Sequence, residues 1–284
     1  MQHSLTVDGV TIQYWVYNPK ATTTVVIVHG FTGSHEGFQY ITPSLSNLRL
    51  VIPDLPGFGA SDLPEREHWS IDALAQLANR FVAELRLASP PHLFGHSMGG
   101  LVASSMLAQA KTGLFHEKAV LLSPVPTAIR RNDRRRPGAI LGALQYRIGH
   151  RAGKAGEKLV KSRQISRALS RFIMTTTDRQ LRREIYQHHF KNLDHISSIE
   201  YYSQLYADIN RRGSIDYAEK LCRYQILLIT GSSDTVTPLA EQKKFAHAID
   251  PATFTVLPRA GHLTHYERAD EVADEINRFI GKAS

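Results

Sequence analysis

The chain has 284 residues, 42% of them hydrophobic, which is enough to bury the core of one large domain or two ordinary ones and argues against disorder. The formal net charge of +8 is unevenly distributed, because residues 126–223 hold 21 lysines and arginines against 9 acidic residues, whereas the rest of the chain holds 13 against 17. No signal-peptide pattern and no apolar run of about 20 residues is present, which predicts a cytoplasmic protein without a transmembrane segment.

The first part of the chain alternates short apolar runs with longer helical patterns. The Val/Ile-rich run 24–29 is typical of a strand buried on both faces, and Asp8-Gly9 favours a tight hairpin turn between the first two runs. This alternation predicts βαβ units and a mostly parallel sheet flanked by helices. The predicted strands are 5–7, 12–16, 24–29, 49–53, 92–95 and 119–123, and the predicted helices are about 71–87 and 98–111.

The pattern breaks after the sixth predicted strand. Between residues 124 and 223 helical periods, arginine clusters and glycines replace the strand runs, and the alternation then resumes with strands at 225–230 and 253–257 and helices from Leu239 and Asp270. We interpret this as an α/β core of residues 1–125 and 224–284, interrupted by a basic, mainly helical cap or lid of residues 126–223 over one edge of the sheet.

The strongest chemical signal is Gly95-His96-Ser97-Met98-Gly99-Gly100, which joins a predicted strand to a predicted helix. In a nucleophile elbow the serine occupies a sharp, strained turn, and small residues two positions to either side let strand and helix approach closely. Gly95 and Gly99 meet that need. A bare Gly-x-Ser-x-Gly is common by chance, so the strand and helix around it carry much of the prediction that Ser97 is a nucleophile.

A serine hydroxyl needs a base within reach and an acid that orients the base. His262 follows the last predicted strand and is the candidate base, whereas the neighbouring His265 is expected at the surface or in packing. Asp234 follows the strand at 225–230 and is the candidate acid, with a turn or helix-capping role as its alternative. Asp133, which follows the sixth strand, is the rival acid.

Acyl transfer also needs hydrogen-bond donors for the developing oxyanion. The backbone N–H of Met98, directly after the nucleophile, is one expected donor. The backbone N–H of Phe31, in the loop His29-Gly30-Phe31-Thr32-Gly33, is the other. His29 itself is expected to have a structural role.

These motifs resemble those of the α/β-hydrolase superfamily, and within it the cap-bearing esterases, lipases and C–C hydrolases. The resemblance covers most of the chain outside residues 126–223 and is specific for the fold but weak on the substrate. It implies that Asp54 belongs to a structural turn, and serine at position 97 disfavours the members with an aspartate nucleophile, such as haloalkane dehalogenases. The matching segments are His29-Gly30, 54–61, 95–100, 231–238 and Gly261-His262.

The interpretation with the fewest assumptions is a serine hydrolase that cleaves a carboxylic ester through an acyl-enzyme on Ser97. A thioesterase or a C–C bond hydrolase would use the same three residues, as would a cofactor-free haloperoxidase-like enzyme. An alternative of another class is a small-molecule receptor on a hydrolase scaffold. The sequence leaves the oligomeric state open.

The basic cap has two interpretations. It could steer a small ester or acyl substrate of anionic or lipid-like character into the site, or it could simply be a solvated helical face. No nucleic-acid reader motif is present, so no nucleic-acid partner is predicted. His188-His189 lacks the spacing of a metal site and Gly57-x-Gly59 is no dinucleotide fingerprint, so we predict neither a metal nor a cofactor.

Two further expectations concern buried side chains. Apolar residues of the cap are hypothesised to line an acyl pocket, with packing of the cap onto the core as the alternative. Cys222 is the single cysteine, which excludes an intramolecular disulfide, and we expect it to be a small buried hydrophobe. The apolar cap residues are Ile140, Leu141, Leu144, Tyr146, Phe172, Ile173 and Met174.

Overall fold

A computed structural model describes residues 1–128 and 137–281 of the chain. Its centre is an eight-stranded sheet in the order β1-β2-β4-β3-β5-β6-β7-β8, in which β1, β2 and β4 pair antiparallel and all other neighbours pair parallel. The strands are β1 Gln2–Val7, β2 Val10–Tyr17, β3 Thr24–Val28, β4 Arg49–Pro53, β5 His92–His96, β6 Lys118–Leu122, β7 Gln225–Gly231 and β8 Ala252–Leu257. The predicted fold class is confirmed.

Helices cover both faces of this sheet, because successive residues of a buried strand point to opposite sides. In β3, Val26 and Val28 pack in the hydrophobic cluster with α1 and α2, whereas Val25 and Ile27 pack in the cluster with α11. On the first face lie α1 Ile71–Glu84, α2 Met98–Gln109, α8 Ala218–Leu221 and α9 Leu239–Ala248, and on the second lie the short helices η1 His35–Phe38 and η2 Thr42–Leu45 and the C-terminal α11 Ala269–Gly281.

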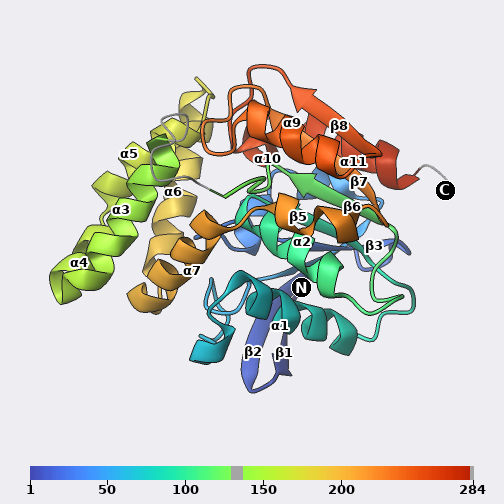
Figure 1. Cartoon of the computed structure of the whole chain (residues 1–284), viewed down its shortest axis with the longest axis horizontal. Coiled ribbons are helices and arrows are strands. Elements are labelled where there is room, and N and C mark those ends of the chain that lie inside the picture. The colour runs from blue at the N-terminus through green and yellow to red at the C-terminus, as the bar shows by residue number, and fades with distance from the viewer. Residues whose placement is uncertain (129–136, 282–284) are drawn as a thin grey trace.

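The described part of the segment between β6 and β7 is mainly helical, as predicted. Five of its helices, α3 to α7, stand together at one side of the sheet domain, on the left in Figure 1. Their starts carry ordinary capping signals: the side chains of Ser162, Asp178 and Ser198 accept backbone N–H bonds at the first turns of α5, α6 and α7. The bounds are α3 Pro137–Arg151, α4 Gly153–Val160, α5 Arg163–Ile173, α6 Arg179–Asp194 and α7 Ile199–Arg211. We call α3 to α7 the cap.

Polar bonds and a small apolar cluster attach the end of α5 to the sheet domain. The carboxylate of Glu267, at the end of α10 Thr264–Glu267, accepts bonds from the backbone of Thr175 and Thr176 just after α5. Met174 packs in the same cluster as Leu263 and Tyr266. The end of α5 is therefore fixed against the segment that follows β8.

The segment after the cap returns to the sheet domain before β7 begins. Its helices η4 Ser214–Tyr217 and α8 pack on α2 and α9. Cys222, directly after α8, is exposed, so the expectation of a buried cysteine was wrong. The residue lies at the end of a four-residue helix, and only Leu221 of that helix is buried.

Among the residues that the structure describes, none of the helices combines the length and the apolarity needed to cross a bilayer.

Candidate active site

Ser97 occupies the turn between β5 and α2 with backbone angles φ 56° and ψ −120°, which L-residues adopt only under strain. The glycines of the motif explain how this turn fits. A Cβ added at Gly95 would lie 2.3 Å from the carbonyl oxygen of Gly99, and one added at Gly99 would lie 2.2 Å from the carbonyl oxygen of Val28. Strand, helix and the neighbouring β3 therefore meet at a distance that only glycine permits.

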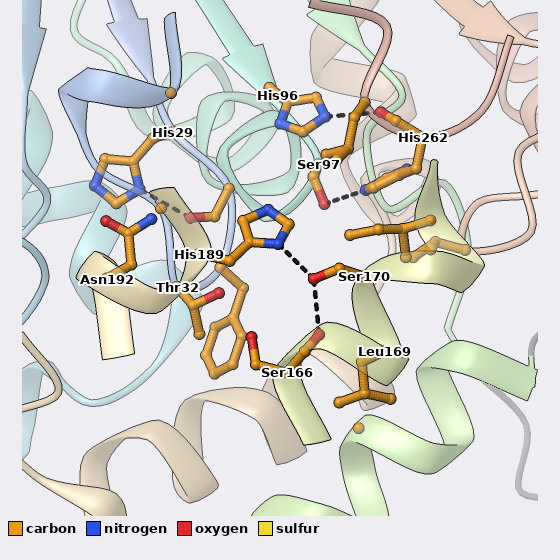
Figure 2. A pocket seen from close by; sticks show the side chains of 18 of the residues that line it. His29, Thr32, His96, Ser97, Ser166, Leu169, Ser170, His189, Asn192 and His262 are labelled. Carbon is orange, nitrogen blue, oxygen red and sulfur yellow. Dashed lines mark hydrogen bonds between the residues drawn. The ribbon is translucent and has the colours of Figure 1, made fainter. Parts of the chain in front are cut away.

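The structure brings Ser97, His262 and Asp234 together. The Ser97 Oγ lies 2.8 Å from Nε2 of His262, and Nδ1 of the same ring lies 2.8 Å from Oδ2 of Asp234. The ring and the carboxylate are both buried. Figure 2 shows the hydroxyl of Ser97 pointing toward the His262 ring.

The surroundings of Asp234 keep its carboxylate ionised. Burial alone would raise the pKa of Asp234, but His262 and the hydrogen bonds from Thr237 outweigh burial and lower this pKa. The backbone N–H groups of Val236 and Thr237 donate to Oδ1 at 2.8 and 2.9 Å. An ionised carboxylate only accepts, so Nδ1 of His262 carries the proton and Nε2 is left bare to accept the Ser97 hydroxyl.

Sheet topology explains why residues so far apart in sequence meet. Ser97, Asp234 and His262 follow β5, β7 and β8. These strands run parallel, so all three residues lie at the carboxyl ends of the strands, on the same end of the sheet. Loops at the carboxyl ends of parallel strands are the usual place for a ligand site in open α/β sheets. Asp133, the rival acid, lies outside the described residues.

The two expected oxyanion donors lie next to Ser97. Met98 is the first residue of α2, where a backbone N–H has no acceptor within the helix. The loop after β3 runs beside the serine, since a Cβ added at Gly30 would lie 3.2 Å from Cβ of Ser97. Phe31 follows in this loop and its ring contacts Tyr146 and Tyr206 of the cap.

His29 and Asp54 are held in a hydrogen-bonded turn below this loop. Nε2 of His29 accepts from the backbone N–H of Leu55 at 2.9 Å, and its Nδ1 donates to the carbonyl of Gly30 at 2.8 Å. Asp54 accepts from the backbone and the ring of His35 and from the backbone of Ala60. These contacts fit the structural roles expected of both residues.

A cavity of about 230 Å³ lies between Ser97 and the cap. Loops after the strands form one wall, and α3, α5, α6 and α7 form the other. None of the described residues that line it is a lysine, an arginine, an aspartate or a glutamate. The polar lining residues of the cap are Gln145, Ser166, Ser170, His189, Asn192 and Tyr206.

Only some of the apolar cap residues that were hypothesised to line a pocket do so. Tyr146 and Ile173 line the cavity, whereas Leu144 and Phe172 are 44% and 54% exposed, so for the latter two the hypothesis was wrong. Met174 instead packs the cap onto the core, the alternative considered for these residues. The side chains of Ile140 and Leu141 lie outside the described residues. Apolarity alone does not say which face of a cap helix turns inward.

Three histidines that line the cavity had not been predicted as site residues from the sequence. His265 was expected at the surface or in packing, but it is buried, lines the cavity and packs against the ring of His96 at 4.1 Å between centroids. Nε2 of His96 donates to the backbone carbonyl of His262 at 3.2 Å. Burial lowers the pKa of His96 to about 3 and that of His189, on α6, to about 4. The place of His96 inside the Ser97 motif was an available signal, whereas nothing in the sequence marked His189.

The positive charge of the cap lies outside the cavity. Four arginines of α5 and α6 border a separate groove, and one of them, Arg167, lies over the ring of Tyr186. These arginines are Arg167, Arg179, Arg182 and Arg183. Within residues 1–128 and 137–281, no three histidine, cysteine or acidic side chains gather closely enough to hold a metal ion.

Known proteins resemble this chain over nearly its whole length. It is 26% identical over 281 residues to the uncharacterized hydrolase YugF of Bacillus subtilis, covering 97% of this chain and 96% of that protein. It is 27% identical over 278 residues to the dihydrolipoyllysine-residue acetyltransferase component of the acetoin cleaving system of Pseudomonas putida, covering 97% of this chain and 68% of that protein.

Among solved structures, the enol-lactonase from Burkholderia xenovorans LB400 superposes with a TM-score of 0.79 at 19% identity, covering 99% of this chain and 100% of that one. This likeness concerns the fold alone. The alpha/beta hydrolase family matches residues 25–275, a span that contains the elbow and the segments after β7 and β8. The chain therefore belongs to the alpha/beta hydrolase family.

Proposed function

We propose that this protein is a serine hydrolase that cleaves a small carboxylic ester through an acyl-enzyme on Ser97. The hydrogen-bonded series Ser97, His262 and Asp234 is the observation that carries the proposal, because both distances are 2.8 Å and the tautomer of His262 leaves Nε2 free to accept a proton. A receptor has no need of a serine in a strained turn bonded to an oriented base.

In the first half of the reaction, Ser97 Oγ attacks the ester carbonyl while Nε2 of His262 takes the hydroxyl proton. The negative oxygen that forms is stabilised by the backbone N–H groups of Met98 and Phe31. The carbon–oxygen bond to the alcohol then breaks, His262 returns the proton to the leaving oxygen, and an acyl-serine remains.

In the second half, His262 removes a proton from water, and the hydroxide attacks the acyl-serine. The bond to Ser97 breaks, the serine recovers its proton and the carboxylic acid leaves. Asp234 stays ionised throughout and stabilises the imidazolium that forms twice in the cycle.

The cavity supports a short and uncharged substrate. Its volume of about 230 Å³ is below the roughly 300–1,000 Å³ of sites for drug-sized ligands. Since the described lining carries no charged side chain of Lys, Arg, Asp or Glu, an anionic group in this space would have no cationic partner. The basic groove on the cap is thus no argument for an anion at Ser97.

The test compares the wild-type protein with Ser97→Ala on p-nitrophenyl esters of graded chain length, together with labelling by a fluorophosphonate. We expect turnover of the shortest esters, a loss of about a millionfold in the variant as in the best-studied serine hydrolase, and labelling of the wild type alone. Labelling without ester turnover would direct the search to thioesters or to carbon–carbon bonds beside a ketone. If the wild type shows no ester turnover and no labelling, the result would favour a receptor and refute the proposal.

A further inference from the structure

The cap side of the cavity carries polar groups that the proposed ester chemistry does not use. Ser166 and Ser170 lie on α5, and His189 and Asn192 lie on α6. Figure 2 shows His189 and Ser170 beside the space below Ser97, with Ser166 farther down and Asn192 beside His29. We call these four residues the cap subsite. An apolar lining would suffice for a simple acyl chain, so their presence calls for a ligand with matching polarity.

The contacts of Ser170 favour one tautomer of His189. The hydroxyl of Ser170 lies 2.7 Å from the carbonyl oxygen of Ser166, which can only accept, so the single hydroxyl proton is donated there. Ser170 Oγ also lies 2.6 Å from Nδ1 of His189. With the hydroxyl proton donated to the Ser166 carbonyl, the ring donates in this second bond and Nδ1 carries the proton.

The opposite nitrogen of the ring is therefore a bare acceptor. Burial lowers the pKa of His189 to about 4, so the imidazole is neutral at pH 7 and holds one proton only, on Nδ1. Among the described residues none is recorded within hydrogen-bond distance of Nε2. Figure 2 shows the ring lying between Ser170 and the side chain of Ser97, on the cavity side of α6.

A bare acceptor in this setting selects among ligands. A carboxylate or phosphate would face the lone pair of Nε2 of His189, and none of the described lining residues is a lysine or arginine that could pair with its charge. A hydroxyl, in contrast, would donate a hydrogen bond to Nε2. Asn192, one turn after His189, is already bonded to the buried Ser34, from Ser34 Oγ to Oδ1 at 3.2 Å, which holds its amide beside the same space.

From this geometry we infer that the cap subsite recognises a hydroxyl group of the substrate through Nε2 of His189. The substrate is then a small hydroxylated ester, with the hydroxyl on the acyl or on the alcohol portion. This inference rests on the proposed function, since it names the substrate class of the same site.

Matched esters test the inference. On the acyl side, p-nitrophenyl butyrate is compared with p-nitrophenyl 3-hydroxybutyrate, and p-nitrophenyl hexanoate is compared with p-nitrophenyl 6-hydroxyhexanoate. On the alcohol side the pair is ethyl butyrate with 2-hydroxyethyl butyrate, followed by acid release. In at least one pair we expect the wild type to prefer the hydroxylated ester by about tenfold or more in kcat/KM, because an ester without the hydroxyl leaves Nε2 of His189 without a hydrogen-bond partner in the cavity.

Three variants separate recognition from folding. His189→Phe should reduce the preference to near one while still turning over the plain ester. Ser170→Ala frees Nδ1 to lose its proton to the other nitrogen and should weaken the preference. The matched control is His188→Phe, because the neighbouring His188 contacts Gln39 and is not among the cavity residues, and it should leave the preference unchanged.

The outcomes are distinguishable. A wild type that turns over esters with no preference in any pair refutes the inference but not the proposed function, as does a preference that survives in His189→Phe. Failure of all esters together with absent fluorophosphonate labelling refutes the proposed function itself. Labelling of Ser97 in His189→Phe verifies that this variant is folded, and His189→Gln, whose amide oxygen can accept, should retain part of the preference if Phe is not tolerated.

Discussion

The two walls of the cavity are built on different principles. On the sheet side, Ser97, Asp234 and His262 lie just beyond β5, β7 and β8, three parallel strands of one sheet, and the strand pairing sets their separation. On the cap side, Ser170 and His189 belong to separate helices, α5 and α6, and side-chain packing decides which face of each helix is turned toward the cavity. If Ser97 and the cap subsite act as proposed, the reaction chemistry depends on the sheet, and substrate choice depends on a helical layer that can change without altering the sheet.

The largest expected effect comes from the sheet wall. Asp234→Asn keeps the size of the side chain but removes the charge that fixes the tautomer of His262, so kcat should fall by about 10⁴-fold with little change in KM. Steady-state kinetics on a short p-nitrophenyl ester measures this. Thr235→Val, at the exposed neighbouring residue, is the control. A loss below about tenfold would mean that Asp234 has only the turn or capping role.

A smaller effect is expected from His96, which acts on the base through its backbone. His96→Phe removes the donor to the carbonyl of His262 and should lower kcat by about fivefold at nearly constant KM, in line with a hydrogen bond of about 1 kcal/mol. His96→Gln keeps an amide donor and should recover part of the rate. If KM rises while kcat is unchanged, His96 contacts the substrate instead.

The buried histidines should make stability fall in mild acid. Burial lowers the pKa of His92 and of His189 to about 4 and that of His96 to about 3, whereas an unfolded histidine titrates near 6.5. Between these values only the unfolded chain binds the proton, so the free energy of unfolding is highest above pH 6.5 and decreases toward pH 4, by up to about 1.4 kcal/mol per pH unit for each fully buried histidine.

Urea unfolding at pH 7.5, 6.0 and 5.0 measures this slope. His92→Gln should make this slope shallower, because it removes one of the histidines whose pKa is lowered by burial. The control is His3→Gln, since His3 lies exposed on β1. If the free energy of unfolding depends on pH equally in His92→Gln and in the wild type, His92 does not contribute to the loss of stability in acid.

The smallest effect is expected from the outer face of the cap. The double variant Arg182→Gln/Arg183→Gln removes two charges that border the outer groove and do not line the cavity. Its kcat/KM on an uncharged short ester should stay within about twofold of the wild type, because exposed charges are screened over about 8 Å at physiological ionic strength. A salt-dependent loss on that neutral ester would show that the two faces of the cap act together.

The sequence alone determined the parts of this protein that depend on local backbone geometry. The elbow at Ser97 was readable because its turn needs glycine at positions 95 and 99, where a Cβ would collide with backbone carbonyls. The strand runs were readable because a parallel strand buried on both faces is a continuous apolar stretch. Asp234 and His262 followed from their positions directly after strands, and the structure brings both to Ser97.

The tertiary structure decided what faces the cavity from the cap. A helical period marks an apolar face but not the element that covers it, so Phe172 was expected inside and is exposed, whereas His189 went unnoticed and lines the site. For the same reason Cys222 was expected to be buried and is exposed, and His265, expected at the surface or in packing, is packed but also lines the site. Which side chains meet across two helices depends on contacts between residues distant in the chain, and these exist only once the cap is packed against the sheet.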